Sequence, residues 1–332
     1  MYRTNFFVTA CVVLLGTPQW SAANRLHELI QAGKEDFEVL KAELEKPETK
    51  HPEVLNEPDD KGRTPLHLAA QLGDVLAVRL LIEQGANKDA KNSKKDIKNN
   101  FSDETPLHVA ALNGHIDVVN ELLGKGADKE ARDAKQWTPL HSAAASGESE
   151  VVNALLASEV ATSVIDVNNK TPLHVASEFC HANALVALLE KDATIINEPD
   201  DKGRTPLHFA AESGCMDAAV ALFEKGADID KQDKKDKQQK TPLHLAAAYA
   251  HTQNDLDKKR RVKKKVDHEV VYKYLLSKGA KQLEDADKRT PEMILKGLFG
   301  ARKTVIELSK DPLERALQEF SGSLQALAQP GK

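Results

Sequence analysis

The chain has 332 residues, of which 29% are charged and only 5% are aromatic. So few aromatic residues argue against one large globular core, and the length allows either two ordinary domains or one elongated array built from small residues. The formal net charge of -5 gives no reason to expect a nucleic-acid partner.

The first 23 residues have the pattern of a cleaved signal peptide. Arg3 supplies a positive charge, residues 6–16 form an apolar run, and Ser21 and Ala23 have the small-residue spacing of a signal-peptidase site. The run is short for a bilayer span, so an uncleaved anchor is the weaker alternative. We expect residues 1–23 to be removed and the mature protein to be exported, into the periplasm or the medium, without stable membrane insertion.

Residues 24–58 come next, and we expect helices over residues 25–45 that cap the N-terminal end of a longer array. From residue 59 onward the string Thr-Pro-Leu-His recurs. It starts at Thr64, Thr105, Thr138, Thr171, Thr205 and Thr241, and a degraded copy starts at Thr290. The spacing of 33 residues between several copies, lengthened elsewhere by insertions, is typical of a repeat array.

Local residue preferences predict how each copy folds. Threonine is a good helix N-cap and proline is favoured at the first helical position, so each string should open a helix. An aspartate stands five residues before most of these threonines, for example Asp133 and Asp236, where we expect a turn. The string NEPDDKGRTPLH occurs twice, at residues 56–67 and 197–208. We interpret it as such a turn entering a helix; a recent duplication, or a contact shared by one partner, remains open.

These motifs resemble the ankyrin-repeat family. The segments TPLHLAAQLGD, TPLHVAALNGH and DVVNELLGKGAD match its first helix, its turn and its second helix. The resemblance covers residues 59–309, with six near-complete copies and a degraded seventh. It implies an all-α repeat solenoid of stacked helix-turn-helix units with β-hairpin tips. It also implies that the histidine of each string ties neighbouring loops together by hydrogen bonds.

Enzymatic chemistry has little support in the sequence. The repeated histidines would lie one per layer, which does not suit a metal site, and CxxC, HExxH and GxSxG motifs are absent. We therefore expect no metal, no cofactor and no catalysis. Cys180 and Cys215 would be the only cysteines after signal cleavage, and whether they pair depends on the distance between their Cα atoms.

Two insertions interrupt the array, at residues 91–100 and 251–265, and a helical tail is expected at residues 310–332. The second insertion contains a basic run: Lys258, Lys259, Arg260, Arg261, Lys263, Lys264 and Lys265. A solvated loop is the simplest interpretation. The alternatives are contact with an anionic surface or nuclear import. Import would fit only a secreted effector delivered into a host cell.

The resemblance places partner contacts on the tips and on the exposed ends of the first helices. The side chains at these positions that we expect to bind a partner are Phe101, Leu112, Trp137, Phe179, Tyr249, Arg63, Arg204 and Lys170. Large apolar groups are common anchors of interfaces. The alternative is that each packs on a neighbouring tip. The sequence therefore predicts a monomeric protein-interaction scaffold whose partner is another protein.

The exits of the third and fourth repeats differ from the others. Glu159 and Asp192 stand where other repeats have a glycine, and a left-handed backbone there is unfavourable for residues with a side chain. We expect these two junctions to be the weakest of the array.

The signal peptide can be tested on the native protein. N-terminal sequencing should find Asn24 first, because cleavage is expected after Ala23. A native chain that starts at Met1, or one acylated at Cys11, would contradict cleavage at this site.

Overall fold

The computed structural model describes residues 22–33, 37–92, 103–234, 238–250 and 268–299. Over these residues the chain is helical and contains no β-strand, so the predicted β-hairpin tips are turns without strand pairing. Most of the predicted signal peptide, most of both insertions, the basic run 258–265 and the tail 310–332 lie outside the described residues.

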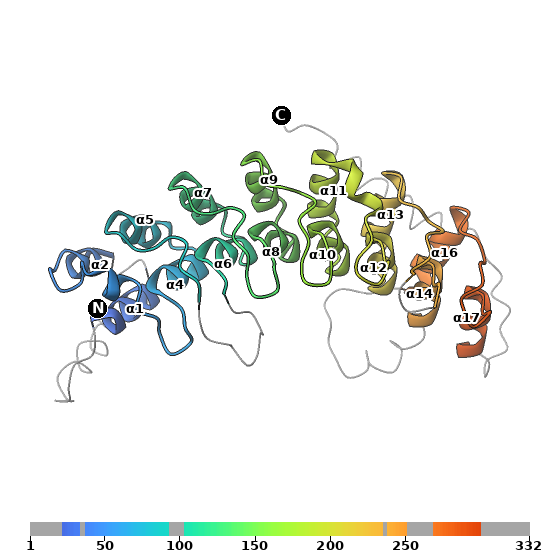
Figure 1. The fold of residues 1–332 in the computed structure, drawn as a ribbon, viewed down its shortest axis with the longest axis horizontal. Helices are drawn as coiled ribbons and strands as arrows, with labels where there is room; N and C mark the ends of the chain where they lie inside the picture. The colour runs from blue at the N-terminus through green and yellow to red at the C-terminus, as the bar shows by residue number, and fades with distance from the viewer. Residues whose placement is uncertain (1–21, 34–36, 93–102, 235–237, 251–267, 300–332) are drawn as a thin grey trace, which may run out of the picture.

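The helices form two rows along an arc (Figure 1). The first helices of repeats 1 to 7 are α4 (Pro65–Leu72), α6 (Pro106–Leu112), α8 (Pro139–Ser146), α10 (Pro172–Glu178), α12 (Pro206–Glu212), α14 (Pro242–Tyr249) and α17 (Pro291–Phe299). The second helices of repeats 1 to 6 are α5 (Val75–Glu83), α7 (Ile116–Gly124), α9 (Ser149–Ala157), α11 (Ala182–Lys191), α13 (Met216–Glu224) and α16 (His268–Ser277). The first helices and the tips lie on the inner side of the arc.

Further helices precede or interrupt the repeats. An N-terminal unit contains α1 (Ala22–Ala32), α2 (Phe37–Leu44) and α3 (Pro52–Leu55), and the short 3-10 helix η2 (Ala193–Asn197) follows α11. The first helices of repeats 1 to 6 present leucine and alanine to their neighbours; in α4, Leu66, Ala69 and Ala70 are fully buried. The small alanine side chains allow adjacent first helices to pack closely.

In repeats 1 to 6, a histidine side chain helps to cap the N-terminus of the first helix. In repeat 1, Nδ1 of His67 accepts the backbone N–H of Thr64 at 3.3 Å, and the Thr64 hydroxyl oxygen accepts the N–H of His67. The same reciprocal arrangement occurs at the other five strings. It is a capping box in which histidine replaces the usual glutamate.

The other ring nitrogen joins consecutive repeats. Nε2 of His67 donates to the carbonyl of Glu104, at the tip of the next repeat, at 2.9 Å. Equivalent bonds of 2.9 to 3.1 Å run from His108, His141, His174, His208 and His244 to the carbonyls of Trp137, Lys170, Arg204, Lys240 and Arg289. Because Nδ1 accepts an N–H, the ring proton is on Nε2. The resemblance implied such ties, and the geometry confirms them.

The N-terminal unit uses the same bond. His27 of α1 lies with Nε2 2.9 Å from the carbonyl of Arg63, at the tip of repeat 1. Helix α1 therefore occupies the place of a first helix. No Thr-Pro-Leu-His string marks it in the sequence, which predicted only a helical cap here.

Each tip is closed by a carboxylate or amide oxygen. Asp133 Oδ1 accepts the backbone N–H groups of Lys135 and Trp137 at 2.8 and 2.7 Å. In the longer tips, a residue further before the threonine takes this role: Asn92 accepts the N–H of Glu104. Asp233 does the same for Lys240, so it replaces Asp236, which the sequence had suggested and which lies outside the described residues.

After the second helices of repeats 3 and 4, the sequence predicted an unfavourable left-handed backbone at Glu159 and Asp192. The structure confirms this backbone at the first position and not at the second. Glu159 has a left-handed backbone, with φ of 59°, as expected for a residue at the glycine position. Asp192 does not: its φ is -150°, which is extended. Its carboxylate instead accepts hydrogen bonds from Thr162 and from the backbone N–H of Thr194 at the start of η2. Backbone strain at this position is thus confined to Glu159.

The buried rings make the array sensitive to acid. Burial lowers the pKa of five of them to about 4: His67, His108, His141, His174 and His208. An unfolded histidine titrates near 6.5. Between these values the unfolded chain binds protons that the folded chain excludes, so stability is fully present above pH 6.5 and is lost as the pH falls toward 4. The loss is about 3 kcal/mol for each ring.

The urea concentration at the midpoint of unfolding should therefore be lower at pH 5 than at pH 7. His141→Gln should lower the midpoint at pH 7 and weaken the pH dependence, since it removes one of the buried rings whose pKa is lowered. His51→Gln is the matched control, because His51 is exposed, and it should leave the dependence unchanged. A midpoint that stays constant over this range would contradict the assignment of neutral buried rings.

Candidate functional site: the inner face

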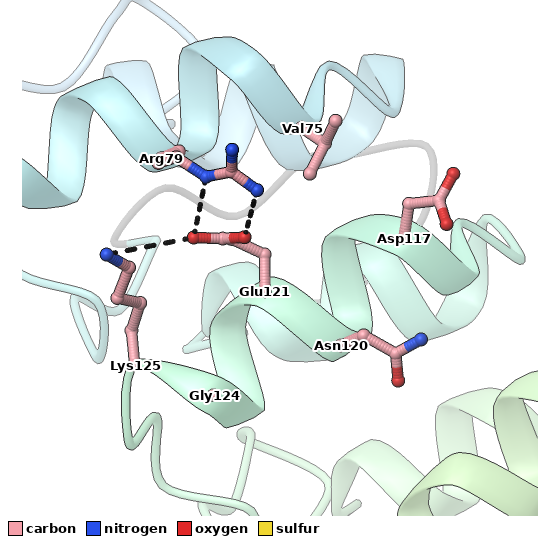
Figure 2. A pocket seen from close by; sticks show the side chains of 7 residues that line it. All are labelled: Val75, Arg79, Asp117, Asn120, Glu121, Gly124 and Lys125. Atoms are coloured by element: carbon pink, nitrogen blue, oxygen red, sulfur yellow. Dashed lines mark hydrogen bonds and ion pairs between the residues drawn. The ribbon is translucent and has the colours of Figure 1, made fainter.

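The outer side of the solenoid carries a shallow hollow that contains a network of ion pairs (Figure 2). It lies between α5 and α7, where Arg79 binds Glu121 through two hydrogen bonds of 3.2 and 2.8 Å. Lys125 lies 3.8 Å from the same carboxylate and 3.4 Å from Glu83. These side chains brace repeat 1 against repeat 2.

Neither a metal-binding cluster nor a membrane-spanning helix is present in the part of the chain that the structure describes. No group of three or more His, Cys, Asp or Glu side chains is arranged there to hold a metal ion. Among the described helices, none is both long enough and apolar enough to cross a bilayer.

On the inner side, the predicted cationic contacts are bound within their own repeats. Arg204 Nε and Nη2 donate to Asp200 Oδ2 at 3.0 and 2.9 Å, and Nη1 donates to Glu212 Oε2 at 3.0 Å. Lys170 donates to Glu178 at 2.7 Å. These bonds connect a tip to the inner end of the first helix eight residues later. Both regions therefore share one face of the molecule.

Repeat 1 has the same arrangement as repeat 5. Arg63 binds Asp59 Oδ2 at 3.0 and 2.7 Å and Gln71 Oε1 at 2.7 Å. Burial raises the pKa of Asp59, but the bonds and the charge of Arg63 outweigh it and hold that pKa below its usual value. The duplicated string thus builds two equivalent joints. The eight-residue pairing could have been found from a basic residue before the threonine and an acid or amide at the seventh position after it.

A buried aromatic ring extends this network across repeats. Phe209 of α12 is 3% exposed, and the ammonium of Lys170 and the guanidinium of Arg204 lie 4.7 and 4.2 Å from its ring centroid. Cations over an aromatic face are attracted to it. Glu212 accepts a further bond of 3.2 Å from the hydroxyl of Tyr249, at the end of α14. The inner ends of repeats 4, 5 and 6 are thereby held in a fixed arrangement.

The predicted apolar contacts have different outcomes. Phe179 and Tyr249 are 48% and 37% exposed at the ends of α10 and α14. Leu112 is half-buried at the end of α6, and Phe101 lies outside the described residues. The sequence overlooked Ile165 as a candidate. Val167 was not selected either.

Trp137 was wrongly expected to be exposed. Only 9% of it is accessible, and its Nε1 donates to Asp166 Oδ2 in the neighbouring tip at 3.2 Å. The ring stacks on His141 with centroids 6.1 Å apart, and its own carbonyl accepts the bond from His108. Trp137 therefore packs between two tips, whereas Arg63, Lys170 and Arg204 at the same position reach the end of their own first helix.

The tip of repeat 4 presents the apolar pair that the sequence missed. Ile165 and Val167 are 43% and 59% exposed on one turn. The N–H of Val167 donates to the carbonyl of Lys135 at 3.0 Å, and the carbonyl of Asn168 accepts the N–H of Asp201 at 2.9 Å. Backbone bonds to both neighbouring tips thus hold the turn in place. We call Ile165, Val167, Phe179 and Tyr249 the inner apolar set.

Comparison with known proteins agrees with the repeat pattern. A family model described as ankyrin repeats (3 copies) matches residues 26–133, 90–166, 107–198, 140–233 and 196–256. A search of curated proteins finds no match.

The different environments of Trp137 and Phe179 can be tested by their effects on stability. Trp137→Ala should lower the free energy of unfolding by about 3 kcal/mol or more, because it opens a cavity between two tips. Phe179→Ala should change it by about 0.5 kcal/mol or less, since half of the ring is already exposed. Urea titrations of both variants measure this. Equal stability losses would show that the two side chains are not packed as described.

Proposed function

The chain belongs to the ankyrin-repeat family, and we propose that it is a non-catalytic scaffold that binds another protein through its inner face. Solenoids of this kind offer an extended concave surface rather than a closed pocket. The partner is a single protein that contacts several consecutive repeats, and the scaffold acts as a monomer.

The observation that supports this proposal most strongly is the fixed exposure of the inner apolar set. Exposed apolar side chains favour binding because covering them removes apolar surface from water. Here the turn of Ile165 and Val167 is held by backbone bonds, and Tyr249 by its bond to Glu212. Since these groups are already ordered, binding costs little conformational entropy. Aromatic anchors of this kind often contribute a large share of the affinity.

The charged residues Arg63, Lys170 and Arg204 have a secondary role in this proposal. Their ion pairs orient the inner ends of the first helices and place partly exposed cationic groups on the same face as the apolar set. Partly exposed pairs of this kind contribute modestly to affinity. Leu112 extends the apolar surface toward repeat 2, and Phe101 remains a predicted contact.

We further propose that the protein acts after export. The N-terminal pattern of residues 1–23 supports this, and so does the disulfide between Cys180 and Cys215, because structural disulfides persist mainly in oxidising compartments. The second candidate is a secreted effector that acts inside a host cell. It is favoured by the basic run 258–265 in a protein of net negative charge. Finding the native protein inside host cells would favour the effector.

The scaffold proposal can be tested by capture with matched variants. Mature wild-type protein and the double variant Val167→Asp/Phe179→Ala are immobilised and exposed to the native exported fraction. The control is Leu76→Asp/Val39→Ala, because these two apolar residues are similarly exposed, at 42% and 44%, on the second helices of repeat 1 and the N-terminal unit. Circular dichroism confirms the fold of each variant.

The wild type and the control should retain the same protein. The amount retained by Val167→Asp/Phe179→Ala should be lower by a factor of about ten or more, as expected when an interface anchor is removed. Capture that is equal on all three baits, or that falls only with the control, would contradict binding through the inner face.

A further inference from the structure

At the inner edge, just beyond each first helix, the ninth residue after the threonine lies against the next repeat. In repeats 1, 2 and 3 it is Gly73, Gly114 and Gly147, all with φ between 71° and 80°. A β-carbon on Gly73 would lie 2.7 Å from Nδ1 of His115, and one on Gly147 would overlap the ring of His181. Both histidines are N-caps of the next second helix. A side chain at this position therefore points directly at the neighbouring N-cap.

Repeat 4 has a cysteine at this position. Cys180 has the same left-handed backbone, with φ of 64°, and the N-cap that it faces in repeat 5 is Cys215. The two form a disulfide with Cα atoms 5.3 Å apart, within the usual range for such bonds. The side chain of Cys180 and the N-cap side chain that it faces would otherwise be too close, and here they are joined by a covalent bond.

Other joints use a hydrogen bond at this point. Nε2 of His115 donates to the carbonyl of Gln71 at 3.0 Å, and Nε2 of His181 donates to that of Ala145 at 3.0 Å. At the joint between repeats 4 and 5, the disulfide replaces the histidine, beside a hydrogen bond of 2.8 Å from the hydroxyl of Ser213 to the carbonyl of Glu178. Only a bond of this chemical kind can be opened and closed by redox chemistry.

We propose that the Cys180–Cys215 disulfide is a redox-controlled latch at the joint between repeats 4 and 5. When it is reduced, the two sulfur atoms move from bonding distance to van der Waals contact, so the side chains or the loops that carry them must shift apart. Cys180 is then left as a side-chain-bearing residue in a left-handed conformation without its compensating bond. The inner edge of this joint therefore opens.

The reductant is a dithiol. Its thiolate attacks Sγ of Cys180, because Cys180 is half-buried whereas Cys215 is only 5% exposed. The S–S bond breaks, a mixed disulfide forms at Cys180, and Cys215 leaves as a thiolate that takes up a proton. The second thiol of the reductant attacks the mixed disulfide and releases Cys180 as a thiol. Two electrons and two protons pass to the protein, and the reductant leaves as a cyclic disulfide.

Opening is local because other bonds across this joint do not involve sulfur. His174 still donates to the carbonyl of Arg204 at 3.1 Å, and the tips remain bonded through Asp201 and Asn168. Phe179 precedes Cys180 directly, so the change occurs beside the inner apolar set. The latch itself goes beyond the proposed function, since it concerns the joint whether or not a partner binds.

Hydrogen exchange on the mature full-length chain tests the latch, with dithiothreitol as the reducing probe. Reduction should increase exchange about threefold or more over residues 177–183 and 211–218, while residues 143–150, at the preceding inner edge, should not change. Maleimide labelling of the denatured protein reports the thiol content of each sample.

The matched control is the double variant Cys180→Gly/Cys215→His, which installs the glycine and histidine of the other joints. It should fold, show the low exchange of the oxidised wild type and be unaffected by dithiothreitol. Cys180→Ser/Cys215→Ser should exchange like the reduced wild type without any reductant.

Two results would overturn the latch. One is equal exchange of the oxidised and reduced wild type. The other is two free thiols in protein prepared under oxidising conditions. If the serine variant does not fold, the comparison of wild type with and without dithiothreitol still decides between these outcomes.

Discussion

Consecutive repeats are joined by a hydrogen bond from a buried, neutral histidine ring to a main-chain carbonyl of the following tip. The ring is fixed from both sides: Nδ1 accepts the N–H of the capping threonine, and Nε2 donates across the joint. A charged ring would lose its acceptor at Nδ1 and would carry its charge in a buried site, both of which are unfavourable. Each joint therefore depends on the protonation state of one ring. This dependence explains why the same four residues return in repeats 1 to 6 while the surrounding sequence varies.

The same bond determines what remains available for binding. The histidine donates a hydrogen bond to the carbonyl of the residue before each threonine and so fixes the backbone of the tip. The side chain of that residue then extends along the surface. Arg63, Lys170 and Arg204 then reach the inner end of their own first helix. Trp137 instead packs on the neighbouring tip. The arrangement leaves the inner apolar set exposed on a rigid frame, which is the form of surface that a protein partner can cover at little entropic cost.

Much of this fold follows from the sequence, because the information is local and repeated. N-caps, first-turn prolines and buried leucine and alanine positions recur along the chain, so the solenoid was predictable, and the histidine ties were implied by the resemblance to ankyrin repeats. The candidate site was less so. The position of Trp137 within its repeat indicates a tip, but whether its ring faces solvent or the next tip depends on a neighbour 29 residues away. Phe179 and Tyr249 were found because they lie at the ends of helices.

Other features depend on contacts that no single repeat encodes. The exposed pair Ile165 and Val167 is notable only once both neighbouring tips are placed. Asp192 has an extended backbone instead of a left-handed one, and in this conformation its carboxylate accepts hydrogen bonds from Thr162 and Thr194. The pairing of Cys180 with Cys215 requires knowing that a side chain after the first helix points at the next N-cap. Long-range geometry of this kind is set by the stacking of repeats, not by local preference.

The central claim, that neutral histidines carry the joints, is tested most directly by nitrogen-15 NMR of the imidazole rings. At pH 7 the rings of His67, His108, His141, His174 and His208 should all show a protonated Nε2 and an unprotonated Nδ1. They should keep this state down to about pH 5 while the chain remains folded, because their pKa values are lowered to about 4. Rings that carry the proton on Nδ1, or that titrate near the ordinary value of about 6.5 in the folded protein, would contradict the account.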